Sequence, residues 1–95
     1  MKNSKTTSRD LTQLYEGLLR LKTADDCKKF FRDLCTLTEL TSMAERFKVV
    51  KLLDKGLPYR EIGEKTGSST ATITRIAHYL HHGKGGYKLV LKRLK

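Results

Sequence analysis

The chain has 95 residues, of which 20 are Lys or Arg and 10 are Asp or Glu, so its formal net charge is +10. A chain of this length suits one domain but buries only about 60% of its unfolded surface, which makes a monomer marginal and favours a dimer. The positive charge favours a polyanionic partner, nucleic acid or an anionic membrane surface, and no apolar run approaches the roughly 18 residues of a membrane span.

The N-terminal residues, MKNSKTTSRD, have positive charges but no hydrophobic stretch behind them, so we expect no signal peptide and a cytoplasmic location. Cys27 and Cys35 are then expected to be reduced thiols rather than a disulfide or a metal site. Residues 1–8 are polar and are predicted to form a disordered tail. Residues 9–95 are predicted to form a single helical domain.

The apolar residues beyond the tail repeat with the period of a helix. The first stripe consists of Leu11, Leu14, Tyr15 and Leu18. Thr23 is a favourable N-cap for a second helix, with Asp25 and Asp26 in its first turn. The stripe of that second helix consists of Cys27, Phe30, Phe31 and Leu34.

A third helix is predicted from the capping box Thr36-Leu-Thr-Glu39 to about Lys55. Gly56 is a natural terminator after it, and the only proline of the chain, Pro58, follows two residues later. The residues that this helix is expected to bury are Leu40, Met43, Ala44, Phe47, Val50 and Leu53.

Two short helices follow, with the pattern of a helix-turn-helix at about residues 59–81. Pro58 can open the first, from Tyr59 to about Thr66, and Gly67 breaks it. Ser68 or Ser69 can cap the second, which runs to about His81. A last helix, 87–94, is predicted after a glycine-rich loop. The sequence therefore predicts an all-α fold of about six helices.

The second of these short helices has one apolar and one polar side. Its apolar stripe is Ile73, Ile76, Ala77 and Leu80, while Ala71, Thr74, Arg75 and His78 point away and Thr72 lies on the flank. Small side chains let a helix end enter a major groove, and a threonine offers a hydroxyl and a methyl group to base edges. The run TGSS could instead be only a capping turn between two structural helices.

The segment RFKVVKLLDKG…YREIGEKTGSSTATITR, Arg46 to Arg75, resembles the bacterial tryptophan repressor family, in particular its YerC/YecD branch. The resemblance covers about residues 36–95 and is most specific at ATITR and YREI. It implies an intertwined homodimer that binds operator DNA as a transcriptional regulator. The DNA-contacting positions of the family fall on Arg60, Thr70, Ala71, Thr72 and Thr74. A lysine contact of the family falls on Gly63, so that contact is absent or is made by Lys65.

Further DNA contacts are expected from the serines of the turn and from the basic C-terminal segment. The full candidate set is Arg60, Lys65, Ser68, Ser69, Thr70, Ala71, Thr72, Thr74, Lys84 and Lys88. The C-terminal segment GKGGYKLVLKRLK contains no acidic residue and lacks the spacing of a nucleotide-binding loop. We expect it to contact the DNA backbone or to pack on the partner's reading head.

The resemblance also implies a ligand pocket, because the family binds tryptophan between two arginines that match Arg46 and Arg75. A glycine beside the second arginine is replaced by Ile76, and a serine that helps to hold the amino group is replaced by Tyr79. These larger side chains crowd the pocket, so L-tryptophan is expected to bind weakly or not at all. The arginines could instead hold another anion or DNA phosphate, or Arg46 could pair with Glu45 or Glu39.

The three histidines are assigned no role. His78 and His82 have a spacing that can bind zinc, but no cysteine or acidic residue is placed to complete a ligand set, so we expect a solvated or phosphate-facing pair and no metal, with His81 beside it.

The sequence thus favours a double-stranded DNA-binding transcriptional regulator, a repressor, that acts as a homodimer without a cofactor or a membrane. The alternative is a basic helical module that binds RNA or protein without operator specificity; exposed aromatic platforms for single-stranded RNA are missing. The sequence shows no catalytic triad, no paired carboxylates on one face and no set of metal ligands, so it gives no indication of an enzyme. A small-molecule effector other than L-tryptophan is left open.

Overall fold

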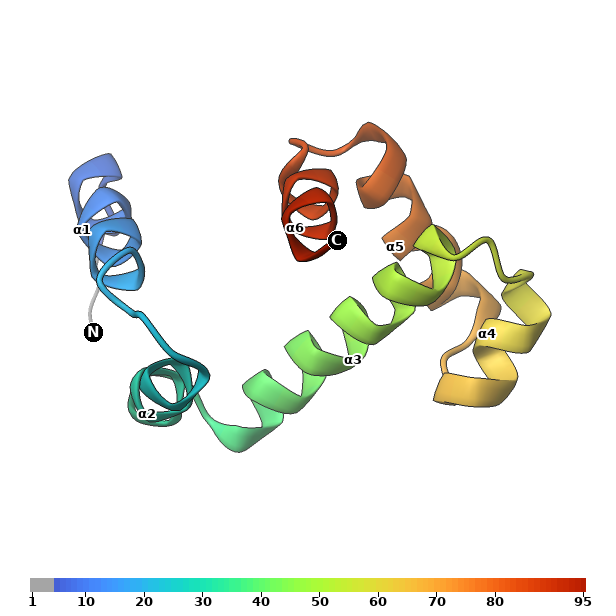
Figure 1. The fold of residues 1–95 in the computed structure, drawn as a ribbon, viewed down its shortest axis with the longest axis horizontal. Coiled ribbons are helices and arrows are strands. Elements are labelled where there is room, and N and C mark those ends of the chain that lie inside the picture. The colour runs from blue at the N-terminus through green and yellow to red at the C-terminus, as the bar shows by residue number, and fades with distance from the viewer. Residues whose placement is uncertain (1–4) are drawn as a thin grey trace. The chain divides into compact units, whose positions relative to one another are not determined.

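The computed structural model describes residues 5–95, and these residues form six helices with no strand among them (Figure 1). The helices are α1 (Ser8–Leu18), α2 (Ala24–Leu34), α3 (Leu37–Asp54), α4 (Tyr59–Thr66), α5 (Thr70–His82) and α6 (Gly86–Leu94). The predicted all-α fold is confirmed. The chain divides into two compact units, Met1–Leu40 and Thr41–Lys95. The single domain predicted for residues 9–95 stays a prediction.

The first helix begins earlier than the predicted tail allows. Thr7 Oγ1 accepts a hydrogen bond from the Asp10 N–H at 3.1 Å, and the Asp10 carboxylate accepts one from the Thr7 N–H at 3.0 Å. This capping box places Thr7 and Ser8 in an ordered helix start, because it satisfies two N–H groups that would otherwise lack partners. The rest of the predicted disorder, on residues 1–4, lies outside the described residues.

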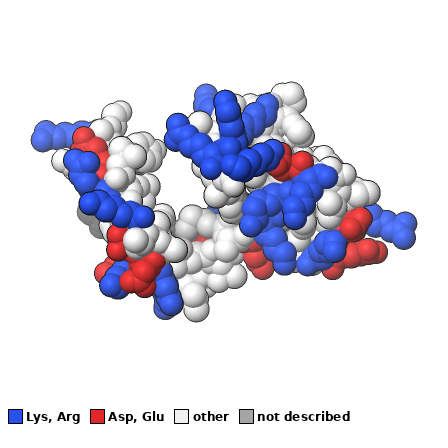
Figure 2. All heavy atoms as spheres, viewed as in Figure 1, with Lys and Arg blue, Asp and Glu red and all other residues white. Residues whose placement is uncertain are grey.

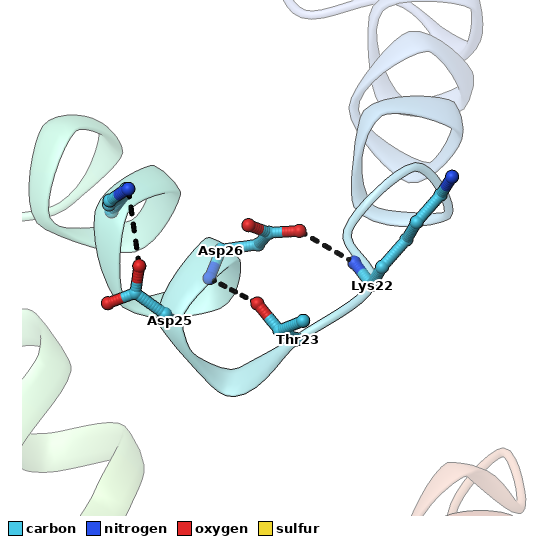
Figure 3. A network of polar contacts seen from close by, with 5 residues as sticks. Lys22, Thr23, Asp25 and Asp26 are labelled. Carbon is cyan, nitrogen blue, oxygen red and sulfur yellow. Dashed lines mark hydrogen bonds and ion pairs between the residues drawn. The ribbon is translucent and has the colours of Figure 1, made fainter.

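The second helix begins as the sequence predicts (Figure 3). Thr23 Oγ1 accepts the Asp26 N–H at 3.0 Å, and the Asp26 carboxylate accepts the Lys22 N–H at 3.1 Å. Asp25 forms an ion pair with Lys29 one turn later, at 3.2 Å, between two exposed side chains. The start of α2 is therefore fixed by local polar contacts, and the acidic side chains also suit the positive end of the helix.

Helices α1 and α2 bury none of their residues in the single chain. The two helices approach each other at Gly17, where a Cβ atom would lie 4.0 Å from the ring of Phe30. Phe30 and Phe31 form an edge-to-face pair with ring centres 5.9 Å apart. Large apolar side chains of this unit stay exposed, namely Leu11, Tyr15, Leu19, Leu34 and Leu37. The unit therefore has apolar surface that its own residues do not cover.

The third helix starts at the predicted capping box. Thr36 Oγ1 accepts the Glu39 N–H at 3.1 Å, and the Glu39 carboxylate accepts the Thr36 N–H at 2.8 Å. The hydrogen bond from the Thr36 backbone is the main reason why the pKa of Glu39 lies below its ordinary value, and the Thr36 hydroxyl adds to the effect. The helix ends before Gly56, whose φ of 84° is the left-handed conformation expected of a terminating glycine.

The hydrophobic core of the second unit is built from α3 to α6. Its buried cluster is Val49, Val50, Ile62, Ile73, Ile76, Leu80 and Leu91. Of the residues expected to be buried, Val50 is buried, Leu40, Phe47 and Leu53 are partly buried, and Met43 and Ala44 are exposed in the single chain. The sequence missed Val49. Two adjacent valines can both be buried only where a helix is covered on more than one side, as the C-terminal half of α3 is. The N-terminal half of that helix lacks such cover.

Candidate nucleic-acid interface

Helices α4 and α5 contact each other across a three-residue turn, Gly67 to Ser69 (Figure 1). Pro58 precedes the first helical residue of α4, as predicted, and Gly67 ends that helix with a φ of 75°. A Cβ atom on Gly63 would lie 3.3 Å from the Ser68 carbonyl oxygen, so a side chain there would press against the turn. A glycine at this position therefore lets α4 lie close to the turn.

Two of the small polar residues shape the turn rather than face outward. The Thr66 hydroxyl donates to the Ile62 carbonyl at 2.7 Å and accepts from the Ser68 N–H at 3.1 Å. Ser69 is the N-cap of α5, and its Oγ accepts from the Thr72 N–H at 3.1 Å. The sequence left open whether Ser68 or Ser69 is the cap, and the structure shows Ser69. The capping interpretation of the run is thus correct for Thr66 and Ser69.

The outward side of α5 matches the predicted pattern. Ala71, Thr74, Arg75 and His78 are exposed, Thr72 is half-buried, and Ile73, Ile76, Ala77 and Leu80 are buried. The buried stripe packs into the core with α4 and α6, and so fixes the direction of the opposite side. The first turns of α5 therefore present small polar side chains on a helix whose rotation is set by the core.

The charged side chains around the start of α5 and beyond it are mainly positive. The first turn of α5 contains no acidic residue, unlike the first turns of α1, α2, α3 and α4. Beyond Glu64 the sequence has no Asp or Glu, and its Lys and Arg residues are Lys65, Arg75, Lys84, Lys88, Lys92, Arg93 and Lys95. Arg60 lies 3.9 Å from Glu64 in a solvent-exposed ion pair. The positive helix end is thus free to attract an anion.

The expected DNA-contacting residues fall into two groups. One group surrounds the start of α5 and consists of Arg60, Lys65, Ser68, Ser69, Thr70, Ala71, Thr72 and Thr74. The other group, Lys84 and Lys88, follows the end of the same helix, which by the rise of an α-helix is about 18 Å away. The two groups therefore cannot contact the same few base pairs, and we treat them as separate contact regions.

In the second group, Lys88 belongs to the basic helix α6, which packs on its own chain, and Lys84 lies in the loop before that helix. Leu91 of α6 is buried in the core, and Lys95 forms a 3.3 Å ion pair with Asp54 at the end of α3. Lys88 lines a hollow of about 310 Å³ together with Leu53 and Leu80. In Figure 2 the blue spheres of Lys and Arg gather over this helix. Leu91 packs on its own chain, but Leu89, Val90 and Leu94 of α6 stay exposed, so the expectation that α6 packs on a partner's head stays a prediction.

Three of the four candidate ligand residues line one groove. Arg46, Arg75 and Ile76 border a groove of about 320 Å³, which we call the arginine groove. Ser42, Glu45, Ser68 and Thr72 complete its lining. The sequence missed Ser42, although it lies one turn before Arg46 on the same face of α3, and it named Glu45 only as a possible ion-pair partner of Arg46. Because Ser68 and Thr72 belong to the DNA-contacting set, the groove adjoins the start of α5.

The fourth candidate, Tyr79, does not line the arginine groove. It is 58% exposed and borders a larger hollow of about 700 Å³ on the α6 side, which also includes Arg46, Phe47 and Tyr87. Ile76, in contrast, is only 4% exposed and lines the groove from the core. The crowding expected from Tyr79 is therefore absent from the groove, whereas the crowding expected from Ile76 is present.

Neither arginine of the groove is neutralised by an acidic side chain in the described part of the chain. The ion pairs among residues 5–95 are Lys29–Asp25, Arg60–Glu64 and Lys95–Asp54. The alternative in which Arg46 pairs with Glu45 or Glu39 is thus not observed, although Glu45 borders the same groove. Two unpaired guanidinium groups beside the start of α5 favour an anionic partner.

Among residues 5–95 there is no group of three or more His, Cys, Asp or Glu that could hold a metal ion. Cys27 and Cys35 are free thiols, both partly buried. Every helix within the same residues is too short or too polar to span a membrane. His78 and His82 lie with their ring centres 5.3 Å apart on the exposed side of α5.

Comparison with known proteins gives consistent matches over nearly the whole chain. A family model described as Trp repressor protein matches residues 9–95. The uncharacterized protein YerC of Bacillus subtilis is 40% identical over 95 residues, which cover 100% of this chain and 91% of YerC. The Trp operon repressor homolog of Chlamydia caviae is 40% identical over 76 residues, covering 79% of this chain and 75% of that protein.

A solved structure has the same fold. The crystal structure of a TrpR like protein from Eubacterium eligens superposes with a TM-score of 0.87 at 42% sequence identity. The match covers 97% of this chain and 95% of the Eubacterium chain. At this identity and coverage the likeness extends to all six helices, including α4 and α5.

Proposed function

Since the chain belongs to the Trp repressor family, whose members are transcription regulators rather than enzymes, we propose that it is a sequence-specific regulator that binds double-stranded DNA. Helices α4 and α5 act as its helix-turn-helix, and the first turns of α5 read the major groove. The observation that carries this proposal is the exposed, acid-free start of α5, which presents small polar side chains on a helix fixed by the core.

The reading residues differ in what they offer to DNA. Ala71 and Thr74 are exposed and short enough for the backbone of α5 to approach base edges closely. The N–H groups at the start of α5 and the side chains of Arg60 and Lys65 suit phosphate oxygens. Base contacts set the sequence preference, and phosphate contacts set the position of the helix in the groove.

A second contact region extends the footprint. Lys84 and Lys88 lie beyond the far end of α5, about one α5 length from the reading residues. Side chains of this kind meet phosphates and carry no sequence information of their own. We assign them to the DNA backbone flanking each half-site, where they raise affinity for all sequences alike.

The protein acts as a homodimer in this proposal. Helices α1 and α2 bury none of their residues in the single chain, and they leave Leu11, Tyr15 and Leu34 exposed. A second copy would cover these side chains and add the buried surface that a 95-residue chain lacks. Sedimentation tests this directly: a folded monomer at micromolar concentration contradicts it.

Repression is the regulatory outcome that we propose, and the cytoplasm, where bacterial DNA is found, is the proposed location. The kinship with a Trp operon repressor homolog supports repression, because a dimer seated on an operator blocks its use by other proteins. The proposed binding to DNA requires no cofactor. An anionic effector in the arginine groove is compatible with Arg46 and Arg75, but L-tryptophan is not expected there, since Ile76 fills part of the groove.

Binding to duplex DNA and to RNA of the same sequence distinguishes the proposal from a basic RNA-binding or protein-interaction module. Fluorescence anisotropy should show tighter binding to duplex DNA. With about 6–10 phosphate contacts, the affinity should fall about 10³–10⁵-fold between 50 and 200 mM salt. Equal or stronger binding to RNA would favour the alternative. An affinity for duplex DNA that salt does not change would contradict the electrostatic part of the proposal.

A further inference from the structure

Two of the three histidines near the end of α5 face each other across one helical turn. The exposed rings of His78 and His82 have centres 5.3 Å apart and planes inclined by 45°. His81 is also exposed, but its ring centre lies 6.4 Å from that of His82. The proposed DNA interface uses none of these side chains, so their arrangement needs a separate explanation.

The spacing of the first pair fits a shared metal ion. A metal ion bound by an imidazole nitrogen at about 2.0–2.1 Å lies about 3.2 Å from the centre of that ring. Two rings that bind one ion at a tetrahedral angle then have centres about 5.2 Å apart. The observed 5.3 Å is close to this value. The inclination can adjust by rotation about the last side-chain torsions, whose minima are broad.

The spacing of His81 and His82 does not fit a shared tetrahedral ion. A separation of 6.4 Å between His81 and His82 is reached only when the two nitrogens lie on opposite sides of the ion. Zinc almost always takes a tetrahedral arrangement instead. His81 follows His78 by three residues and precedes His82 by one, so it serves as an internal control with the same chemistry on the same helix.

We propose that His78 and His82 together bind one divalent transition-metal ion of the class that prefers imidazole ligands, Zn²⁺, Ni²⁺ or Cu²⁺. Residues four apart lie on one face of a helix, which makes the pair a chelating site. Residues 5–95 contain no group of three potential ligands, so the other coordination positions of the ion are open to water or to an anion. The sequence alone favoured a solvated or phosphate-facing pair; the ring spacing is the observation that changes this expectation.

The site continues the outward side of α5. Thr74, His78 and His82 follow one another at intervals of four, so a bound ion would add positive charge to the face that carries Thr74. The consequence for DNA rests on the proposed function: zinc should raise affinity for duplex DNA, since an open coordination position suits a phosphate oxygen.

Calorimetric titration of the untagged protein with zinc chloride, without DNA, tests the site. We expect one ion per chain, and a drop in the association constant of roughly tenfold or more for His78→Gln and for His82→Gln, because each variant leaves a single imidazole ligand. His81→Gln should bind zinc as the wild type does. Magnesium, which prefers oxygen ligands, should give no heat.

Three results would overturn the site: an equal loss in His81→Gln, zinc binding that survives in the His78→Gln/His82→Gln double variant, or loss of binding in Cys27→Ser/Cys35→Ser. Circular dichroism checks that each variant is folded. In a separate DNA titration, zinc should tighten duplex binding by the wild type and not by the double variant. If zinc does not change the affinity of the wild type for duplex DNA, the proposed effect of zinc on DNA binding is wrong. If the protein does not bind DNA at all, the zinc titration still tests the metal site.

Discussion

The hydroxyl of Ser69 is joined to both the backbone and the side chain of Thr72. Its Oγ accepts the Thr72 N–H at 3.1 Å and donates to Thr72 Oγ1 at 3.0 Å. Since the Thr72 oxygen already accepts from Ser69, its own hydrogen remains for an acceptor on a base edge or phosphate. One cap therefore couples the stability of α5 to the orientation of a proposed reading residue.

Ser69→Ala should lower the free energy of unfolding by about 0.5–2 kcal/mol, because the cap of α5 is lost. It should also weaken discrimination between DNA sites, since Thr72 loses its partner. Urea denaturation and binding to two related duplexes measure the two effects. Ser68→Ala is the matched control, because the Ser68 side chain is not the cap. If the two substitutions lower the free energy of unfolding equally, the Ser69 cap contributes little to stability.

Thr74→Ala and Lys88→Ala should differ in kind. Loss of a base contact by Thr74 should reduce the preference for the best site by about 1–3 kcal/mol. Loss of a phosphate contact by Lys88 should weaken binding to all duplexes alike and make binding less sensitive to salt. Competition binding with specific and unrelated duplexes separates the two patterns. An unchanged site preference in Thr74→Ala and Thr72→Ala would mean that α5 is not the reading helix.

Gly83→Ala should destabilise the second unit, whereas Gly86→Ala should not. A Cβ atom on Gly83 would collide with the Tyr79 carbonyl oxygen, which accepts the Gly83 N–H at the end of α5. The backbone must then shift and displace the link to α6, at a cost of about 1–3 kcal/mol. Gly86 begins α6 and has open space around it, so alanine there should be neutral or stabilising by up to about 1 kcal/mol. Thermal unfolding of both variants provides the comparison.

The start of α3 should loosen in acid. Hydrogen bonds from Thr36 hold the pKa of Glu39 below its ordinary value of 4.5, so the carboxylate form stabilises the folded chain. That contribution is complete above the ordinary pKa and is lost as the pH falls through the lower, folded-state pKa. Hydrogen exchange of the first amides of α3 should therefore accelerate below about pH 4.5 in the wild type. Glu39→Gln should remove this acid-dependent step; a step that persists would assign it to another carboxyl group.

L-tryptophan should bind weakly or not at all, and Tyr79→Ser should not restore binding. Ile76 narrows the arginine groove and is held in the core, while Tyr79 lies outside that groove. Calorimetry with millimolar L-tryptophan should give no saturable heat for either protein. A micromolar dissociation constant for the wild type would mean that amino-acid sensing is retained. Binding that occurs only in Tyr79→Ser would identify Tyr79 as the block.

The sequence predicted local features well because local residues cause them. The caps at Thr23, Thr36 and Ser69 and the left-handed Gly56 and Gly67 depend on neighbours within a few positions. The buried stripe of α5 followed from helical period alone. The capping box at Thr7 was missed, although the signature Thr-x-x-Asp is present in the sequence, because the polar composition of residues 1–8 suggested a tail.

Features that depend on distant residues could not be read in this way. The burial of Val49 requires cover from elements that follow it in the chain, and the exposure of Met43 requires the absence of such cover. Tyr79 was assigned to the arginine groove by resemblance, but its side chain borders a hollow formed with α6, whose position the helical period does not define. The spacing of the His78 and His82 rings is likewise a property of the folded helix.

Selection of bound duplexes from fragmented genomic DNA tests the central claim, sequence reading by the start of α5, most directly. The Thr72→Ala/Thr74→Ala double variant, which keeps the charge of the chain, is the control. The wild type should enrich fragments that contain two related half-sites about 10–10.5 base pairs apart, as a two-fold dimer requires. The variant should bind DNA but lose this enrichment. Enrichment of the same fragments by both proteins, or of none by the wild type, would contradict the claim.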